Sequence, residues 1–243
     1  MSGDAVALHG WTAVARDADL IFKRQPYLHK PRPLSVSDIA FPSDDPIVEK
    51  VQAYAKEKLP PQTYNHSIRV YYFSMAILKD QFPEHAALSP ATLALTCLLH
   101  DIGTTEENLN ATRLSFEFYG GYLSLDLLNK QLGADRSQAE AVCEAIIRHQ
   151  DIGTVGKITF LGQLIQLATI YDNMGGHPEL VDARTRTDVN KDFPRMGWSR
   201  CFHDTIRREN GLKPWAHTTH LGEEEFPNGV LNNELMKPYD DWK

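Results

Sequence analysis

The sequence predicts an all-α protein, and three observations support that prediction. Apolar residues recur at spacings of three and four along several segments between residues 45 and 210, which is the period of an amphipathic helix. Helix-start signals precede these segments, for example Asp45 before Pro46 and Ser89 before Pro90. No segment shows the alternating apolar and polar pattern of a convincing β-strand. We therefore expect a helical bundle.

The length and composition fit one globular domain. The chain has 243 residues, of which 42% are hydrophobic and 23% are charged. A chain of this size buries a substantial core without disulfide staples. We predict a single domain over residues 1–243, with a helical core over about 45–210. An irregular N-terminal arm over 1–44 and an irregular C-terminal tail over 211–243 would flank that core.

The net charge and the cysteines limit the expected binding partners and the expected cellular compartment. A net charge of −7 argues weakly against nucleic acid or a membrane surface as a partner. No stretch approaches the roughly 20 apolar residues of a membrane span, and residues 1–7 lack a signal-peptide pattern. Cys97, Cys143 and Cys201 are widely spaced and form no CxxC pair. We expect reduced thiols, a cytoplasmic location, and neither nucleic acid nor membrane as a partner.

The two ends of the chain lack helical repeats. Four prolines interrupt the N-terminal arm and turn the residue before each of them away from helix, although a short helical turn near 11–22 fits the pattern. Aromatic residues are interleaved in both arms, which indicates that the arms pack against something. The C-terminal tail would pack either on its own domain or on a neighbouring subunit, and we expect a homo-oligomer of unspecified size.

The first two helices follow from start signals and an apolar stripe. Asp45 starts a helix that runs to Leu59, where two prolines stop it. The second begins near residue 62, and its inward positions recur at spacings of four, three and four: His66, Val70, Phe73 and Ile77. A single histidine on an apolar helix face is usually a hydrogen-bonded core residue. His66 therefore indicates a metal ligand only if other potential ligands lie beside it.

The third helix ends in two polar residues that are costly to bury. Ser89 caps it, and the apolar run 92–99 leads into His100 and Asp101. A divalent cation would satisfy an imidazole and a carboxylate in such a setting. The polar segment 104–108 follows directly, and it either lines a cavity or forms a solvated connection.

The fourth and seventh helices show apolar repeats without inward polar groups. The fourth is predicted over 115–131, and its Gly120-Gly121 pair indicates the close approach of another backbone, since glycine costs about 1 kcal/mol relative to alanine inside a helix. The seventh is predicted over 198–209.

The fifth and sixth helices each bring a polar residue inward. The fifth starts with the capping box of residues 137–140 and places His149 on its apolar stripe. The sixth covers 159–173, and Asp172 shares its apolar face. Because aspartate is almost never buried unpaired, Asp172 also needs a partner.

Several helices thus turn hard-to-bury polar residues toward one interior, which predicts a metal site. The donors are nitrogen and oxygen only, a set that suits Zn, Fe, Mn or Ni without selecting among them. A second pair, His217 and His220, lies in a threonine-rich segment, where we favour surface or hydrogen-bonding roles. The proposed site draws on His66, His100, Asp101, His149 and Asp172.

These residues carry a resemblance to a known family. Their order along the chain resembles the H…HD…D pattern of the HD superfamily of metal-dependent hydrolases, which implies an HD-domain helical bundle. Longer segments resemble the fungal cyanamide hydratase branch of that superfamily: 65–70, 97–105, 115–121, 145–151, 193–195 and 213–218. This branch is implied to be a zinc enzyme that converts cyanamide to urea.

The resemblance implies one zinc ion per chain, held by His66, His100, Asp101 and Asp172. Members of the superfamily with two metal ions carry further histidines after the one that matches His149, and this sequence has none before Asp172. We infer a single ion, with His149 close by but not required as a ligand.

Departures from the phosphohydrolase members favour a substrate without phosphate. Many of them have a lysine where this sequence has Thr104, and the segment that follows offers Glu106 and Glu107 rather than a cationic clamp. Arg69 and Arg148 leave the alternative open, because each lies near a site histidine in sequence. The alternatives are an HD-type phosphohydrolase acting on nucleotides and a non-catalytic binding module with a structural metal.

The expected mechanism is attack of a metal-bound hydroxide on the nitrile carbon of cyanamide, followed by tautomerisation of isourea to urea. His149 is the candidate for orienting the water or carrying the proton. Asn65 and Thr169 are candidates for hydrogen-bonding the substrate amine. For Thr169 we favour a hydrogen bond back to its own helix over this role.

Overall fold

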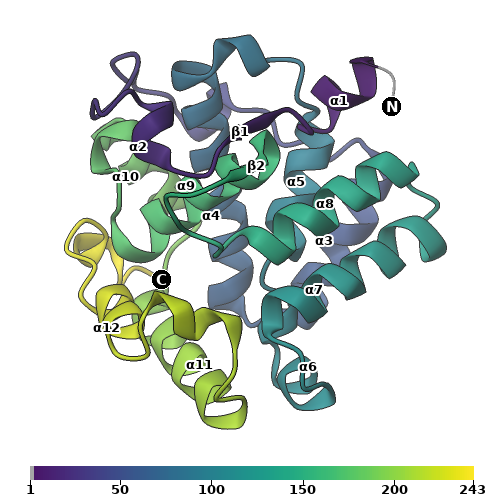
Figure 1. The fold of residues 1–243 in the computed structure, drawn as a ribbon. Coiled ribbons are helices and arrows are strands. Elements are labelled where there is room, and N and C mark those ends of the chain that lie inside the picture. Colours follow the sequence, from purple (N-terminus) through teal and green to yellow (C-terminus); the bar gives the residue numbers. More distant parts are fainter. Residues whose placement is uncertain (1–2) are drawn as a thin grey trace.

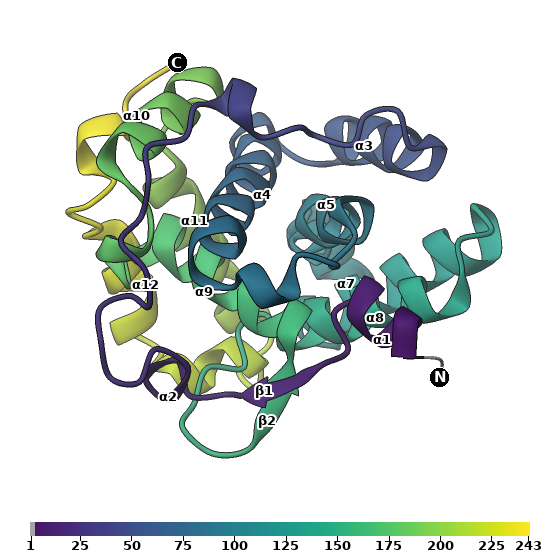
Figure 2. The ribbon, with the colours of Figure 1, turned by 90° about the horizontal axis from the view of Figure 1, so that it is seen from above.

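A computed structural model describes residues 3–243 and shows a helical protein built around one buried helix (Figure 1). This helix is α4 (Pro61–Gln81), and most of its residues are buried. Seen from above, α4 lies between α5 (Pro90–Leu99) and α9 (Phe160–Met174), with α3 (Pro46–Lys58) to one side (Figure 2). The predicted all-α class is confirmed.

Local capping explains where three of these helices begin. Asp45 accepts hydrogen bonds from the backbone N–H groups of residues 47 and 48 ahead of α3, as predicted. Ser89 caps α5 by accepting from Thr92 N, and Thr159 caps α9 by accepting from Gly162 N. Gly175 ends α9 in the left-handed conformation that glycine tolerates.

The segment after α5 is more helical than its polar sequence indicates. Thr105 accepts a hydrogen bond from Asn108 N and starts a short helix, α6 (Glu106–Ala111). The predicted helix over 115–131 is confirmed in position, but it divides into α7 (Phe116–Leu125) and a π-helical turn, Asp126–Gln131. The polar segment is therefore largely a capped helix rather than a loop.

Helix α8 (Arg136–Arg148) begins earlier than its predicted capping box. Asp135 is the cap, because its side chain accepts from Gln138 N, so the box at 137–140 lies inside the helix. The close approach predicted at Gly120-Gly121 is confirmed: a Cβ on Gly121 would lie 3.2 Å from the Cys143 carbonyl oxygen of α8. Glycine is what lets α7 and α8 pack this closely.

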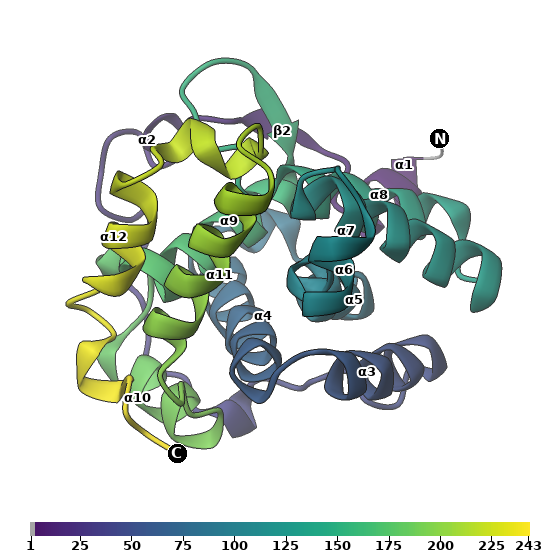
Figure 3. The ribbon, with the colours of Figure 1, turned by 90° about the horizontal axis from the view of Figure 1, so that it is seen from below.

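The C-terminal third adds helices beyond the predicted seventh. They are α10 (Ala183–Asp192), the 3-10 helix η6 (His217–Leu221) and α12 (Glu225–Leu231). The predicted seventh helix is confirmed as α11 (Trp198–Leu212). Helices α11 and α12 lie together on the side of α4 opposite α3 (Figure 3). The predicted irregular tail is thus partly helical, and its helix α12 packs on α11.

The N-terminal arm also contains short elements. They are α1 (Gly3–Leu8), β1 (Ala13–Ala15), α2 (Ala18–Ile21) and the 3-10 turn Val36–Asp38. Strand β1 pairs antiparallel with β2 (Lys157–Thr159), with Val14 opposite Ile158. This two-stranded ribbon brings the arm onto the start of α9, and three residues per strand are too few for a visible sequence pattern.

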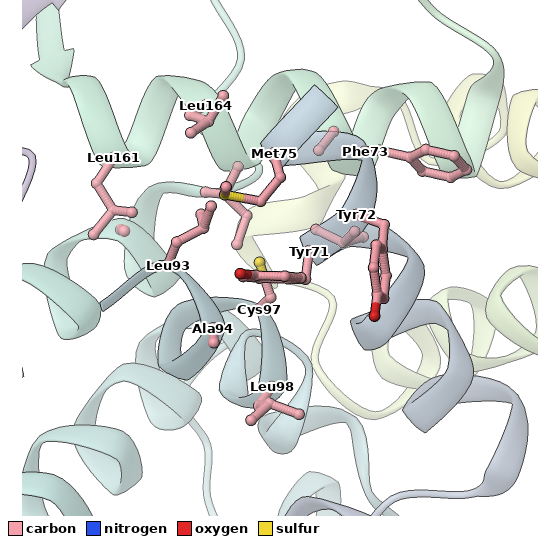
Figure 4. Close-up of a cluster of buried hydrophobic side chains, with 14 of the residues drawn as sticks. Tyr71, Tyr72, Phe73, Met75, Leu93, Ala94, Cys97, Leu98, Leu161 and Leu164 are labelled. Carbon is pink, nitrogen blue, oxygen red and sulfur yellow. The ribbon is translucent and has the colours of Figure 1, made fainter. Parts of the chain in front are cut away.

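The main core forms where α4, α5 and α9 meet. Aromatic and aliphatic side chains of the three helices interdigitate there, with Cys97 among them (Figure 4). Burial raises the pKa of the Cys97 thiol well above its usual range, so it behaves as an apolar core residue. Among residues 3–243 no helix is long and apolar enough to cross a membrane, and no disulfide is formed.

Candidate metal centre

The predicted polar residues come from four helices and are nearly inaccessible to solvent. His66 lies in the second turn of α4, His100 follows the last residue of α5, and Asp101 comes next. His149 follows the last residue of α8, and Asp172 lies near the end of α9. His66 and Asp172 are 0% exposed, and the other three are each 1% exposed.

Hydrogen bonds at Nδ1 fix the tautomer of all three histidines. His66 donates to Asp172 Oδ2 at 2.6 Å, and His100 donates to the Cys97 carbonyl at 2.7 Å. His149 donates to the Ile146 carbonyl at 2.7 Å. Carbonyl and carboxylate oxygens only accept, so the proton of a neutral ring stays on Nδ1 and the Nε2 lone pair is left exposed. Metal-binding histidines are commonly oriented in this way.

Two of these lone pairs converge on one point with a carboxylate. His66 Nε2 lies 3.1 Å from His100 Nε2, and Asp101 Oδ2 lies 3.2 Å from His100 Nε2 and 3.6 Å from His66 Nε2. Neither oxygen of Asp101 accepts a hydrogen bond from residues 3–243. Three acceptors facing each other in a buried site repel unless a cation lies between them. The residues therefore fit a divalent metal ion.

Protons would compete with the ion at this point. Burial lowers the pKa of His66 to about 4. For His100, burial also acts to lower the pKa, but the adjacent Asp101 carboxylate outweighs it and the pKa stands above its ordinary value. A proton on His100 Nε2 would occupy the position where a metal ion binds, so we expect metal affinity to fall in acid.

His149 faces the other oxygen of the same carboxylate. Its Nε2 lies 3.9 Å from Asp101 Oδ1 and has no hydrogen-bond partner within the described part of the chain. It lies outside the group of donors that are mutually within 4.8 Å, which consists of His66, His100 and Asp101. Burial lowers the pKa of His149, so the ring is neutral and presents a proton acceptor beside the candidate metal position.

Asp172 points to His66 and to two arginines rather than to the shared point. Arg69 Nη2 donates to Asp172 Oδ2 at 2.9 Å, and Arg195 Nη1 donates to Oδ1 at 2.7 Å. Burial would raise the pKa of this carboxyl, but the two guanidinium groups hold it well below its usual range. The structure thus brings Asp172 next to His66, where it fixes the ring, but not into the close donor group.

Arg69 and Arg148, the two arginines that could have bound a phosphate in the phosphohydrolase alternative, form hydrogen bonds and ion pairs with other groups. Arg69 also donates to the carbonyls of Phe193 and Pro194. Arg148 pairs with Asp151 at 2.8 Å and donates to the Lys157 carbonyl. Neither guanidinium is thus directed at the candidate metal position as a phosphate clamp.

The two candidate amine-binding residues lie beside the site on the same helices. Asn65 donates from its amide nitrogen to the Pro194 carbonyl at 2.9 Å and is partly buried. The Thr169 hydroxyl donates to the Gln166 carbonyl one turn earlier in α9, at 3.1 Å. The helix-bonding alternative considered for Thr169 is therefore the hydrogen bond that forms.

Sequence reasoning missed the residues that enclose the site. Trp198 stacks on His66 with ring centroids 4.3 Å apart, and Phe116 meets the edge of His149 at 5.6 Å. Arg195, which holds Asp172, comes from the segment between α10 and α11. Phe116 and Arg195 lie in the segments 115–121 and 193–195 that carry the family resemblance, but nothing in the sequence indicates which site residue they contact.

Comparison with known proteins places this site in a family. The model of the HD domain matches residues 63–174, which span His66 through Asp172. Two proteins of Saccharomyces cerevisiae (strain ATCC 204508 / S288c), cyanamide hydratase DDI2 and cyanamide hydratase DDI3, are each 42% identical over 225 residues. The alignment covers 93% of this chain and 96% of each relative. The chain belongs to the cyanamide hydratase family of HD-domain proteins.

Membership in this family supports an enzyme of the metal-dependent hydrolase type with a small-molecule substrate. The HD domain implies a divalent metal ion, and the buried His66, His100 and Asp101 are a group that can hold one.

Proposed function

We propose that this protein is a zinc-dependent cyanamide hydratase that adds water across the nitrile of cyanamide and releases urea. The observation that carries the proposal is the buried trio of unpaired donors, His66 Nε2, His100 Nε2 and Asp101 Oδ2, in a chain that aligns with two cyanamide hydratases over nearly its whole length. The reaction class is hydration by a lyase, with one catalytic ion per chain at this centre.

Two imidazole nitrogens and one carboxylate oxygen suit zinc and leave a coordination position for water. When bound there, the ion supplies a water of lowered pKa and an electrophilic environment. Asp172 enters our proposal as the residue that orients His66 through Nδ1, since both of its oxygens already accept hydrogen bonds from Arg69 and Arg195. This departs from the four-ligand set that the resemblance implies.

His149 is the proposed proton carrier. Its Nε2 is a buried lone pair that faces Asp101 Oδ1, and its Nδ1 is anchored on the Ile146 carbonyl. The neutral ring accepts the proton released as the C–O bond forms, and it returns a proton to the nitrile nitrogen. The product of this step is isourea, which tautomerises to urea with no change in composition.

Asn65 and Thr169 are the proposed acceptors for the substrate amine. The Thr169 hydroxyl donates to its own helix, which leaves its oxygen lone pairs for an amine N–H. Asn65 donates through its nitrogen to Pro194 O, which fixes the amide and leaves its oxygen as an acceptor. Both residues have short polar side chains, which suits a substrate as small as cyanamide, with its three non-hydrogen atoms.

The test is urea formation by the purified, zinc-loaded protein. Cyanamide should be converted to urea, a chelator should abolish the reaction, and zinc should restore it. Metal content is measured in the same preparations. A preparation that retains about one zinc per chain and forms no urea from cyanamide would contradict the proposed function. So would release of inorganic phosphate from a nucleotide panel by a preparation that forms no urea.

We also propose that the protein forms a homo-oligomer. Size-exclusion chromatography with light scattering measures the number of subunits, and a monomer at micromolar concentration would contradict this oligomer without bearing on the proposed reaction.

A further inference from the structure

A second group of histidine and aspartate donors lies outside the proposed catalytic centre. Asp151 follows the end of α8, and His217 and His220 belong to η6 in the C-terminal tail. One donor atom from each of the three lies within 4.8 Å of the other two. We propose that Asp151, His217 and His220 form a second binding site for a divalent transition-metal ion, with zinc as the best-matched ion.

The two histidines are oriented as metal-binding histidines are. His220 donates from Nδ1 to the His217 carbonyl at 2.6 Å, and His217 Nδ1 faces Glu117 Oε1 at 3.4 Å. Both Nε2 atoms therefore carry lone pairs, and the ring centroids lie 4.4 Å apart. A carbonyl or carboxylate behind a ligating histidine is the usual outer support of a zinc site.

The position of η6 is fixed independently of any ion. His217 N donates to Ser115 Oγ at 2.8 Å, and Thr218 Oγ1 donates to Glu117 Oε1 at 3.1 Å and to Gln150 Oε1 at 3.3 Å. These hydrogen bonds hold the turn against the start of α7 and the end of α8. The donors are thus largely pre-positioned, which lowers the entropy cost of binding an ion.

Arginines compete with the ion for the carboxylate of Asp151. Arg148 Nη2 lies 2.8 Å from Asp151 Oδ2, and Arg16 Nη1 lies 3.4 Å from Oδ1. Asp151, His217 and His220 are also partly or largely exposed to water. Both facts make this site weaker than one with unpaired buried donors, so it fills only after the first site.

The chemistry selects the class of ion. Two imidazoles and one carboxylate are borderline ligands that bind Zn²⁺, Ni²⁺ or Cu²⁺ and disfavour Mg²⁺ and Ca²⁺, which prefer all-oxygen sites. Such an ion would tie the C-terminal tail to the helix that carries His149. The site does not depend on the proposed reaction at the first one.

The test counts zinc ions on the zinc-loaded protein. Equilibrium dialysis against zinc in a buffer without chelators, followed by elemental analysis, gives the number bound per chain. The wild type should bind two ions, the second more weakly. His220→Ala, an exposed change, should weaken the second ion at least about tenfold and leave the first in place. His217→Ala should do the same.

The matched control is His203→Ala, which removes a partly exposed histidine of α11 that pairs with Asp204. It should still bind two ions. Saturation of the wild type at one zinc per chain, or retention of the second ion at unchanged affinity in His220→Ala, would overturn the proposal. Urea release, measured alongside, should not change in His220→Ala, so the second site can fail while the proposed function stands.

Discussion

The two histidine and aspartate groups have similar donors but differ in what surrounds the carboxylate. Asp101 is 1% exposed, and within residues 3–243 no lysine or arginine forms an ion pair with it. Asp151 is partly exposed and pairs with Arg16 and Arg148. The first group therefore lacks the positive charge that its burial requires, whereas the second already has it.

The folded protein should therefore be stabilised strongly by an ion at the first group, whereas an ion at the second group should add little to its stability. An unpaired buried carboxylate next to two imidazole lone pairs costs several kcal/mol unless a cation arrives. A carboxylate with two guanidinium partners at the surface has no such need. The experiments below test whether the two groups differ as their surroundings indicate.

The largest effect is expected from the first group. His100→Ala or Asp101→Ala should lose both the more tightly bound ion and detectable urea formation, because each removes one of three converging donors. Elemental analysis and a urea assay on the folded variants test this. A variant that kept one equivalent of zinc and normal turnover would place the reactive ion elsewhere.

His149→Gln should separate chemistry from metal binding. The proposed proton carrier contributes about 10²–10⁴-fold in comparable enzymes, so turnover should fall by that factor while about one zinc per chain remains. Metal content and kcat are compared with wild type. Complete loss of zinc would instead make His149 a ligand.

Asp172→Asn tests whether this carboxylate orients His66 or binds the ion. Loss of an orienting partner should weaken zinc by about 10–100-fold. Arg69 would lose its carboxylate partner while Arg195 keeps Asp240, and an unpaired buried guanidinium should cost about 3–5 kcal/mol of stability. Asp101→Asn is the matched comparison, and its zinc affinity should fall much further. Equal losses in the two variants would make Asp172 a direct ligand.

A buried acid that contacts the start of α7 predicts a pH dependence of stability. Glu209 in α11 accepts from Phe116 N at 2.7 Å, and its pKa is raised to about 7 by burial and by the nearby Glu117. Because the folded pKa lies above the unfolded value, its stabilising contribution is full below about pH 4.5 and is lost as pH rises through about 7.

The stability of Glu209→Gln relative to wild type should therefore rise between about pH 4.5 and pH 7, by at most about 3 kcal/mol. Loss of the pairing with buried Lys213 lowers the stability of the variant, so the test is the change of the difference with pH. Urea denaturation of both proteins at several pH values measures it, and a difference that does not vary with pH would contradict the raised pKa.

The smallest effect is expected from the second group. Zinc added beyond the first equivalent should raise the melting temperature of the wild type by a few degrees, since a ligand that binds only the folded state stabilises by mass action. His220→Ala should show no such rise, while His203→Ala should behave as wild type. A rise of equal size in His220→Ala would remove the thermal evidence for the second site.

Much of the helical core could be predicted because its signals are local. Capping by Asp45, Ser89 and Thr159 marks where helices begin, and a repeat of three and four marks the face of α4 that carries His66. The polar helix α10 was missed because its sequence carries almost no apolar stripe. Short elements such as β1 and β2 gave too few residues for a period.

The site could be predicted only in part, because its geometry depends on how distant segments pack. Inward polar residues were visible from helix periodicity. That Asp172 turns to Arg195 and Arg69 rather than to His100 depends on a segment that follows α10, far along the chain. The approach of the η6 histidines to Asp151 depends on a tail without helical periodicity in its sequence.

The covering of His66 by the Trp198 ring has a kinetic consequence. The indole packs α11 against the His66 ring of α4, so we expect local separation of these two helices to speed the loss of a bound ion. The rate at which a strong chelator removes zinc, followed over hours, would then report how often the two helices separate.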